Sequence, residues 1–429
     1  MKLTRYKLGE ILNVTRGASL SGEFYATEGE YIRLTCGNFD YQNNCFKENK
    51  SKDNLYYVGD FRSEFLMEEG DIITPLTEQA IGLLGSTAII PESGKYIQSQ
   101  DVAKIVCKED LLDKNFAFYL ISSALVKQQL SAAAQQTKIR HTSPDKIKDC
   151  TVWIPELSEQ KRIGKLLRSI DSKIELNRQI NQNLEAMAKQ LYDYWFVQFD
   201  FPNEEGKPYK SSGGNMVWNE KLKRNIPIGW NNGTLIDIAN ITMGQSPDGT
   251  SYNEIGEGVL FYQGSTDFGM RFPSVRQYTT APSRFAKKGD ILMSVRAPVG
   301  AVNIANNDCC IGRGLSALNS KIGSTTHLYY ILNDLRIAFD QRNAAGTTFG
   351  SITKEDLYNL PIVIPAKEVI SAFDKICSPM FDRQMLLGEE IDTLIKQRDE
   401  LLPLLLNGQV LVNSDLSVYK KRRGKVPSS

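Results

Sequence analysis

Few residues of this chain are suited to acid–base or metal chemistry. The sequence holds two histidines, so histidine-rich zinc sites and relays built on a histidine base have almost no material. His141 lies in a polar stretch and is a candidate for ligand contact, whereas His327 begins a helical stretch and is expected at the surface. Chemistry centred on histidine is therefore not expected.

Motifs for nucleotide or metal-dependent chemistry are also weak. Gly94-Lys95-Tyr96 and Gly164-Lys165-Leu166 lack the Ser or Thr that follows Gly-Lys in a phosphate-binding loop, and no Gly-x-Gly-x-x-Gly follows a strand-like run. Asp40 followed by Glu48-Asn49-Lys50 loosely matches the acidic residues of a metal-dependent nuclease. An acid-x-Lys triplet is common by chance in a chain with 24% charged residues, so this match carries little weight.

The composition describes a folded protein of at least two domains. The chain has 429 residues, of which 41% are hydrophobic, enough to bury sizeable cores. Its seven cysteines are scattered without a Cys-x-x-Cys pair, as expected for buried thiols in a reducing compartment. No secretory signal and no run of about 20 apolar residues is visible, so we expect a cytoplasmic protein without membrane contact.

The chain repeats itself, and the repeat defines the elements that must position any site. Three pairs of segments match, with the spacing between residues kept. They are Leu8, Ile11, Thr15, Gly17 and Ser19 with Leu235, Ile238, Thr242, Gly244 and Ser246; Glu69-Gly70-Asp71-Ile72 with Lys288-Gly289-Asp290-Ile291; and Val152-Trp153-Ile154-Pro155 with Ile362-Val363-Ile364-Pro365.

Each repeat is predicted to be an α+β module. Short apolar runs bounded by turn-forming residues indicate strands, at 72–73 and 88–90 in the first copy and at 291–293 and 301–304 in the second. One helix with an apolar stripe is expected in each copy, at 116–121 and at 328–332.

A long helix is predicted after each module. From Ile163, apolar residues and two asparagines recur in alternating steps of four and three as far as Trp195, which is typical of a coiled-coil seam. The second helix repeats the pattern at Val369, Phe373, Ile376 and Met380, and again from Leu387. We expect the phase to slip near Gly388, and Pro403 to kink or end the helix. An antiparallel pair of helices joining two strand-rich modules, with pseudo-twofold symmetry, is the predicted architecture.

The predicted domain boundaries follow from these segments. The chain is divided into a first module at 1–157, a first helix at 158–199, a turn-rich linker at 200–228, a second module at 229–366, a second helix at 367–408 and a basic tail at 409–429.

Several of these segments resemble type I restriction-modification specificity subunits. The run from Ile174 to Asn181 and on to Asp200 is similar to the family's conserved central helix. Gly206–Gly214 and Ile226–Trp230 resemble its connector into a second target-recognition domain, and Leu401–Gln409 resembles the end of its second helix.

The resemblance implies a non-enzymatic DNA-binding function. Such subunits hold two target-recognition domains, each reading one half of a split sequence in double-stranded DNA, and two antiparallel helices that set the unread spacer. Two modification (methyltransferase) subunits that dock on the helices methylate adenine, and restriction (translocase/nuclease) subunits cut. No cofactor is then expected on this chain, since S-adenosylmethionine, ATP and Mg²⁺ belong to the partner subunits.

Candidate base contacts are polar residues on loops flanking the repeated strands. Arg can bond guanine bidentately, and Gln or Asn can bond adenine. The first module offers Arg16, Thr35, Asn38, Gln79, Gln136, Lys138 and Arg140, and the second Gln263, Ser265, Thr266, Arg296, Arg313, Thr347 and Thr348. The candidate partner contacts on the helices are Ile170, Ile174, Asn177, Asn181, Leu184, Leu191, Trp195, Leu387, Ile391, Leu394 and Leu401.

Two alternatives stay open on the sequence alone. One is a self-contained nuclease or methyltransferase, supported only by the Asp40 match, and the other is a coiled-coil adaptor that does not bind DNA. The near balance of 51 basic and 50 acidic residues predicts weak DNA binding by the isolated chain, because duplex DNA favours concentrated Lys and Arg.

Overall fold

The computed structural model describes residues 2–50, 53–78, 82–133, 140–269, 271–344 and 350–412, with the backbone alone for 337–344. Five candidate base contacts, Gln79, Gln136, Lys138, Thr347 and Thr348, and most of the basic tail lie outside this part of the chain. The chain divides into two compact units, unit 1 with Met1–Ile174 and Thr393–Ser429, and unit 2 with Glu175–Asp392.

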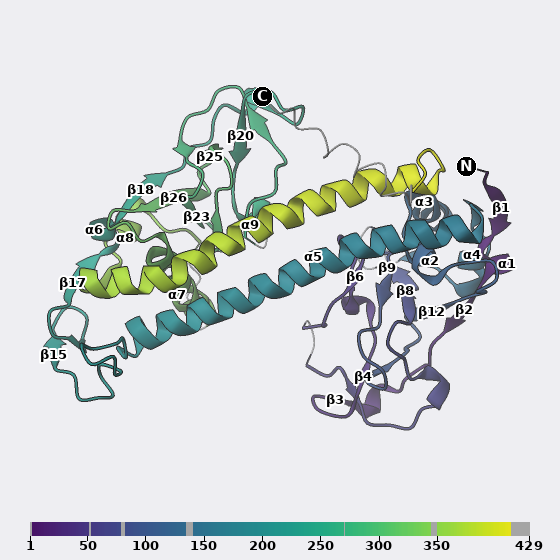
Figure 1. The fold of residues 1–429 in the computed structure, drawn as a ribbon, viewed down its shortest axis with the longest axis horizontal. Coiled ribbons are helices and arrows are strands. Elements are labelled where there is room, and N and C mark those ends of the chain that lie inside the picture. Colours follow the sequence, from purple (N-terminus) through teal and green to yellow (C-terminus); the bar gives the residue numbers. More distant parts are fainter. Residues whose placement is uncertain are drawn as a thin grey trace, which may run out of the picture. The chain divides into compact units, whose positions relative to one another are not determined.

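The first module, in unit 1, is built from two four-stranded sheets and short helices (Figure 1). The first sheet has the order β10 (Ala88–Ile89), β8 (Ile72–Pro75), β12 (Val102–Cys107) and β2 (Leu12–Arg16). The second has the order β11 (Tyr96–Ile97), β4 (Tyr31–Arg33), β7 (Tyr56–Tyr57) and β3 (Tyr25–Ala26).

Smaller elements complete this module. Three strand pairs are β1 (Thr4–Lys7) with β14 (Thr151–Ile154), β13 (Arg140–His141) with β9 (Thr77–Glu78), and β5 (Phe39–Asp40) with β6 (Cys45–Phe46). The helices are α1 (Leu8–Ile11), α2 (Lys114–Ile121), α3 (Ala124–Ala133) and α4 (Pro144–Lys148), with 3₁₀ turns at Gly22–Phe24, Cys36–Asn38 and Ser63–Phe65.

The second module, in unit 2, repeats this topology. Its first sheet has the order β18 (Ala239–Met243), β26 (Leu315–Ser320), β23 (Ile291–Ser294) and β24 (Val302–Ile304). Its second has the order β19 (Tyr252–Asn253), β21 (Tyr278–Thr279), β20 (Val259–Tyr262), β25 (Cys309–Ile311) and β22 (Phe285–Ala286). The module also contains the pair β17 (Asn231–Thr234) with β27 (Pro361–Ile364), α6 (Leu235–Ile238), α7 (Thr325–Ala344), α8 (Lys354–Tyr358) and 3₁₀ turns at Gly249–Ser251 and Ser265–Asp267.

The repeat in the sequence is therefore a repeat in the fold. Thr4 pairs with Ile154 where the first module closes, and Asn231 pairs with Ile364 at the same place in the second. The predicted α+β class is confirmed, because every apolar run assigned to a strand overlaps a strand of one of these sheets and the two expected helices are α2 and α7.

The segment predicted as a linker is folded. Strands β15 (Met216–Asn219) and β16 (Arg224–Pro227) form a hairpin. The Phe201 ring stacks between Tyr209 and Trp230, with ring centroids 4.7 and 5.0 Å away. Turn-forming residues marked the chain reversals here, but the apolar rings between them join the hydrophobic core of the second module.

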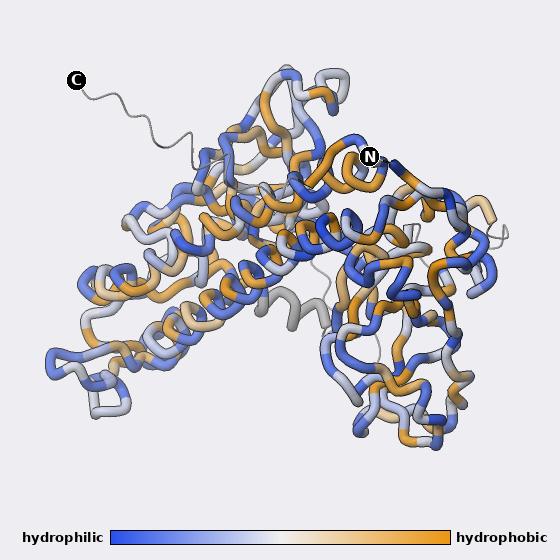
Figure 2. The backbone as a smooth tube through the Cα atoms, turned by 45° about the vertical axis from the view of Figure 1, so that its right-hand side comes forward, coloured by the Kyte–Doolittle hydropathy of each residue, from blue (hydrophilic) through white to orange (hydrophobic). Residues whose placement is uncertain are grey.

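Two long helices follow the modules. Helix α5 spans Leu157–Tyr192 and continues as a π-turn over Asp193–Val197, and α9 spans Lys367–Leu406 (Figure 1). Hydrophobic residues recur along both helices between hydrophilic ones (Figure 2). The first turns of each helix belong to the core of its own module: Ile163 and Leu167 in the first, Phe373 and Cys377 in the second.

Two expectations about α9 are wrong, namely a phase slip near Gly388 and an end of the helix at Pro403. The helix continues through both residues to Leu406. The alternating spacing of four and three residues along the seam is kept, because the buried Gln384 lies between Met380 and Leu387. Gln384 is polar, so a pattern of apolar residues does not count it. Earlier in the helix, Cys377 is buried and Ile376 is exposed, so the seam runs one residue later than expected.

Gly388 is required by a neighbour rather than by an irregular helix. A Cβ built at this position would lie 2.3 Å from Cε2 of Phe272, whose ring is buried against α9. The missing side chain lets the loop of the second module approach the helix backbone closely.

Replacing Gly388 by alanine should lower the free energy of unfolding by about 1–2 kcal/mol. Overpacking against the Phe272 ring outweighs the roughly 1 kcal/mol that alanine gains in helix propensity. Chemical denaturation of a double-mutant cycle checks the cause, because Gly388→Ala should be neutral or stabilising in a Phe272→Ala background. Equal destabilisation in both backgrounds would contradict the proposed contact.

His327 was expected at the surface, and that expectation is wrong. Its side chain is 1% exposed and packs against the Phe196 ring at 4.6 Å. Burial lowers the pKa of His327 from 6.5 to about 3. The unfolded chain therefore binds a proton between these values while the folded chain does not.

The free energy of unfolding should fall by about 2 kcal/mol between pH 7 and pH 5 because of His327 alone. A lowered pKa in the folded state gives stability that is present above pH 6.5 and lost as the pH drops toward 3, at about 1.36 kcal/mol per pH unit. Denaturant unfolding at both pH values should show this loss in the parent and in the exposed-site control His141→Gln. A His327→Phe variant that keeps the full pH dependence would rule the cause out.

Candidate nucleic-acid interface

The predicted base contacts of the second module gather where several strands end. The Val295 N–H donates to Gly314 O at 2.9 Å, and the Gly312 N–H donates to Tyr262 O at 2.8 Å. The Gly244 N–H donates to Leu315 O at 2.9 Å. Through these bonds, the ends of β23, β20 and β18 contact the turn between β25 and β26. We call these strand ends and this turn the loop cluster of the second module.

Three of the predicted residues project from this cluster. Gln263 follows β20, Arg296 follows β23, and Arg313 lies in the β25–β26 turn; all three are exposed. Within the described part of the chain, no ion pair holds Arg296 or Arg313. Two guanidinium groups and one side-chain amide on neighbouring loops are thus exposed to solvent.

A glycine makes this approach possible. A Cβ at Gly244 would lie 2.2 Å from Gly312 O, a distance no side chain tolerates. The matching residue of the first module, Gly17, would place its Cβ 2.2 Å from Gln98 O. In both modules, therefore, a glycine without a side chain lets the end of a strand pack closely against a turn.

Ser265 and Thr266 belong to a 3₁₀ turn beside Gln263. The buried Asp267 accepts a hydrogen bond from the Gln263 N–H at 3.0 Å and pairs with Arg276 at 2.9 Å. Thr266 is exposed and Ser265 is half-buried. The turn thus fixes the backbone of Gln263 while leaving the Thr266 hydroxyl at the surface.

The first module builds the equivalent cluster. The Ala18 N–H donates to Gln98 O at 2.9 Å, and the Leu76 N–H donates to Asp101 O at 2.8 Å. Arg16, at the end of β2, donates from Nε to Gln100 O at 2.8 Å. Arg140, in β13, lies 2.9 Å from Ser131 Oγ and 3.6 Å from Glu78 Oε2. The two arginines are held by neighbours, which orients them but reduces their freedom to reach a base.

Asn38 is a wrong prediction, and Thr35 is a weak one. Asn38 is 1% exposed, accepts a hydrogen bond from the Thr35 N–H at 2.9 Å and donates to Lys47 O. The Thr35 hydroxyl accepts from Gly37 N and from Asn49 Nδ2. Both side chains cap the 3₁₀ turn at Cys36–Asn38, a use that residue type alone does not distinguish from base contact.

Two exposed residues in or beside the loop clusters were not predicted from the sequence. Gln100 occupies the position in the first module that Arg313 holds in the second, since Leu76 N–H binds Asp101 O as Val295 N–H binds Gly314 O. Arg284 is exposed next to the second cluster, and its carbonyl accepts from the Ile311 N–H at 2.9 Å. Carrying the internal repeat through to single residues would have found Gln100.

The predicted partner contacts on the helices lie mostly in the seam between α5 and α9. Ile174, Asn177, Asn181, Trp195, Leu387 and Ile391 are buried, and Ile170, Leu184, Leu191, Leu394 and Leu401 are partly buried. In unit 2, Asn177 Nδ2 donates to Glu390 Oε2 at 2.9 Å, and Gln384 Nε2 donates to Asn181 O at 3.3 Å. The contacts run antiparallel, and these side chains hold the helix pair together.

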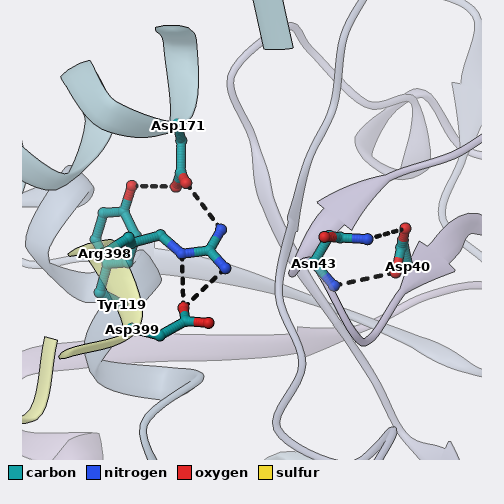
Figure 3. Close-up of polar contacts among 6 residues, drawn as sticks. All are labelled: Asp40, Asn43, Tyr119, Asp171, Arg398 and Asp399. Carbon is teal, nitrogen blue, oxygen red and sulfur yellow. Dashed lines mark hydrogen bonds and ion pairs between the residues drawn. The ribbon is translucent and has the colours of Figure 1, made fainter. Parts of the chain in front are cut away.

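The same pairing in unit 1 includes a charged cluster (Figure 3). Arg398 on α9 contacts Asp171 on α5 at 3.0 Å and Asp399 at 2.8 Å, and Tyr119 of α2 donates to Asp171. Burial first, and the nearby Asp171 carboxylate second, raise the pKa of Tyr119, so its hydroxyl stays a donor. Since the seam is occupied in this way, a surface for partner subunits must use other, exposed residues of the helices.

The nuclease-like match at Asp40 has a local explanation. Asp40 accepts hydrogen bonds from the Asn43 backbone N–H and from Asn43 Nδ2, the latter at 2.8 Å (Figure 3). It also accepts a hydrogen bond from the Gln42 N–H. The carboxylate closes the turn between β5 and β6. Across the residues the structure describes, no group of three or more His, Cys, Asp or Glu could hold a metal ion, and none of the helices combines the length and apolarity of a membrane span.

Comparisons with known proteins agree with the fold. A family model described as the type I restriction modification DNA specificity domain matches residues 2–186 and 227–376. The putative type I restriction enzyme MjaX specificity subunit of Methanocaldococcus jannaschii is 29% identical over 379 residues, which is 84% of each chain. The HindI specificity subunit of Haemophilus influenzae is 23% identical over 385 residues, 74% of this chain and 81% of the other.

Among solved structures, a type I restriction-modification S subunit from M. genitalium is similar with a TM-score of 0.61. The match covers 94% of this chain and 96% of that chain at 16% identity, so it shows likeness of fold alone.

Proposed function

Because the chain belongs to the family of type I restriction-modification DNA specificity subunits, we propose that each of its two modules reads one half of a split DNA sequence. As a specificity subunit, the chain is a non-catalytic component of the system. Residues 1–157 and 229–366 would then be the two recognition modules, and the two helices would set the distance between the half-sites.

The loop cluster of the second module carries this proposal. Arg296 and Arg313 project from adjoining loops without an ion pair in the described residues, and Gln263 lies beside them. A guanidinium reads guanine O6 and N7 bidentately, and a Gln amide reads adenine N6 and N7. In the first module, Arg16, Gln100 and Arg140 take this role, with Thr35 as a weaker candidate and Asn38 withdrawn.

The helices are proposed to set the spacer. Paired antiparallel helices are stiff, and half-sites one turn of DNA apart are separated by about 34 Å. Two modification subunits would dock on exposed faces of the helices, and restriction subunits would join that complex. S-adenosylmethionine, ATP and Mg²⁺ would be bound by these partners.

Arg296→Ala and Arg313→Ala should each relax recognition at single base pairs of one half-site. Loss of a bidentate contact costs about 1–3 kcal/mol of discrimination against the wrong base. Mapping methylated adenines genome-wide, in cells that express the chain with its modification partner, measures this directly. Lys321→Ala, at the other end of β26, is the matched control and should leave the map unchanged.

Equal weakening on every DNA sequence would make either arginine a phosphate contact instead. Loss at both half-sites together would contradict the assignment of one half-site to each module.

Lengthening both helices by one heptad should lengthen the spacer by about three base pairs. Seven residues add about 10.5 Å at 1.5 Å per residue, against about 3.4 Å per base pair. The heptads are placed after Glu175 in α5 and after Ile391 in α9, beside the Asn177–Glu390 contact, so that the seam stays in phase.

The same methylation map reports the outcome. An insertion in α5 alone breaks the pairing and should abolish methylation. An unchanged spacer in the double insertion would overturn the spacing role of the helices, while leaving the base contacts untouched.

A further inference from the structure

One pocket of the first module has a composition that does not suit DNA. Its volume is about 510 Å³, and its lining includes Glu30, Tyr31, Tyr57, Asp60 and Phe61. The Tyr31 and Phe61 rings meet edge to face with centroids 5.1 Å apart, and Tyr57 lies 6.5 Å from Phe61. We call it the acidic aromatic pocket.

The charge around the pocket is negative. Between β7 and Gly70 the chain carries Asp60, Glu64, Glu68 and Glu69 against Arg62 alone, and Arg62 pairs with Glu64 at 2.9 Å. Among the described residues, no lysine or arginine lines the pocket and no ion pair holds Glu30 or Asp60. A phosphate backbone would meet two carboxylates here, so this face is unsuited to DNA.

The second module shows that the fold does not require this composition. Tyr31 pairs with Tyr57 where strands β4 and β7 meet, and the same register position in the second module pairs Val259 with Thr279. The segment that corresponds to 58–69 is 280–288, which carries Arg284, Lys287 and Lys288 and no acidic residue. One scaffold therefore presents an acidic aromatic edge in one module and a basic edge in the other.

The chemistry of the pocket fits a cation on an apolar stem. Aromatic rings attract a guanidinium or ammonium through their faces, and carboxylates beside them add charge complementarity. The sheet already uses this interaction once, since the Arg33 guanidinium lies 3.8 Å from the centroid of the Tyr25 ring. Lysine and arginine side chains have both the charge and the apolar stem that such a pocket accommodates.

We propose that the acidic aromatic pocket of the first module binds a lysine or arginine side chain from a basic segment of a partner protein. Its two carboxylates and the half-exposed rings of Tyr31 and Phe61 supply the recognition, while the buried Tyr57 ring forms the floor. The inference is independent of the bases that the modules read, because it concerns a surface that repels phosphate.

The test uses the full chain and a synthetic peptide, acetyl-Gly-Lys-Gly-Arg-Gly-Lys-Gly-amide, titrated by ligand-observed saturation-transfer NMR. The peptide should bind saturably, and the same peptide with Glu at its charged positions should not. Glu30→Gln/Asp60→Asn should weaken binding about fivefold to tenfold, and Tyr31→Val, which copies the residue of the second module, should weaken it about as much. The control Glu254→Gln/Glu257→Gln, in the second module, should bind as the parent does.

Circular dichroism of each variant establishes that it is folded. The proposal is overturned by absence of saturable binding at millimolar peptide, by equal binding of the acidic peptide, or by binding that neither pocket variant changes. It is also overturned if a short DNA duplex, titrated without the peptide, binds the parent more tightly than the pocket variants, because the pocket would then bind DNA.

Discussion

Each module is built around the first turns of the helix that follows it, and the rest of the structure depends on this burial. Counted from Pro155 and Pro365, the same two helix positions enter the two cores: Ile163 and Leu167 in one, Phe373 and Cys377 in the other. Emptying such a position costs several kcal/mol, because the surrounding side chains relax only partly. A module therefore cannot turn on the first turns of its own helix without opening its core, and its loop cluster keeps a fixed direction relative to those turns.

The seam between the helices is more polar than stability alone would favour. Asn177, Asn181 and Gln384 are buried there, and both amide atoms of Asn181 lack a hydrogen-bond partner in the described structure. A buried amide without partners costs about 1–3 kcal/mol, and an apolar seam would pair the helices more tightly. Buried polar residues at such positions are best known for fixing register. The proposed spacing function needs a fixed register between the two helices, since a slip of one turn would shift one helix along the other by about 5.4 Å.

The sequence predicted the parts of the structure that rest on apolar spacing. The repeat, the sheets and the two long helices all bury residues at regular intervals, so the pattern itself is the cause of the fold. The errors concern residues whose type allows several uses. Gln384 fills a seam position that an apolar count skips, and His327 is buried among aromatic rings. Asn38 caps a turn although its amide suits a base equally well. Only the position of the backbone decides between such uses.

Equivalent positions of the two modules separate what the scaffold needs from what its surface can vary. Gly17 and Gly244 are kept because each backbone passes within 2.2 Å of where a Cβ would sit. At the surface the pairs differ: Gln100 replaces Arg313, and Thr35 stands where Gln263 stands. Amide and guanidinium groups prefer different base edges, so under the proposed function these unlike residues on one backbone would read unlike sequences. The near-zero net charge of the chain is then a sum over unlike surfaces, and the proposed binding to DNA would depend on which edge faces the duplex rather than on the total charge.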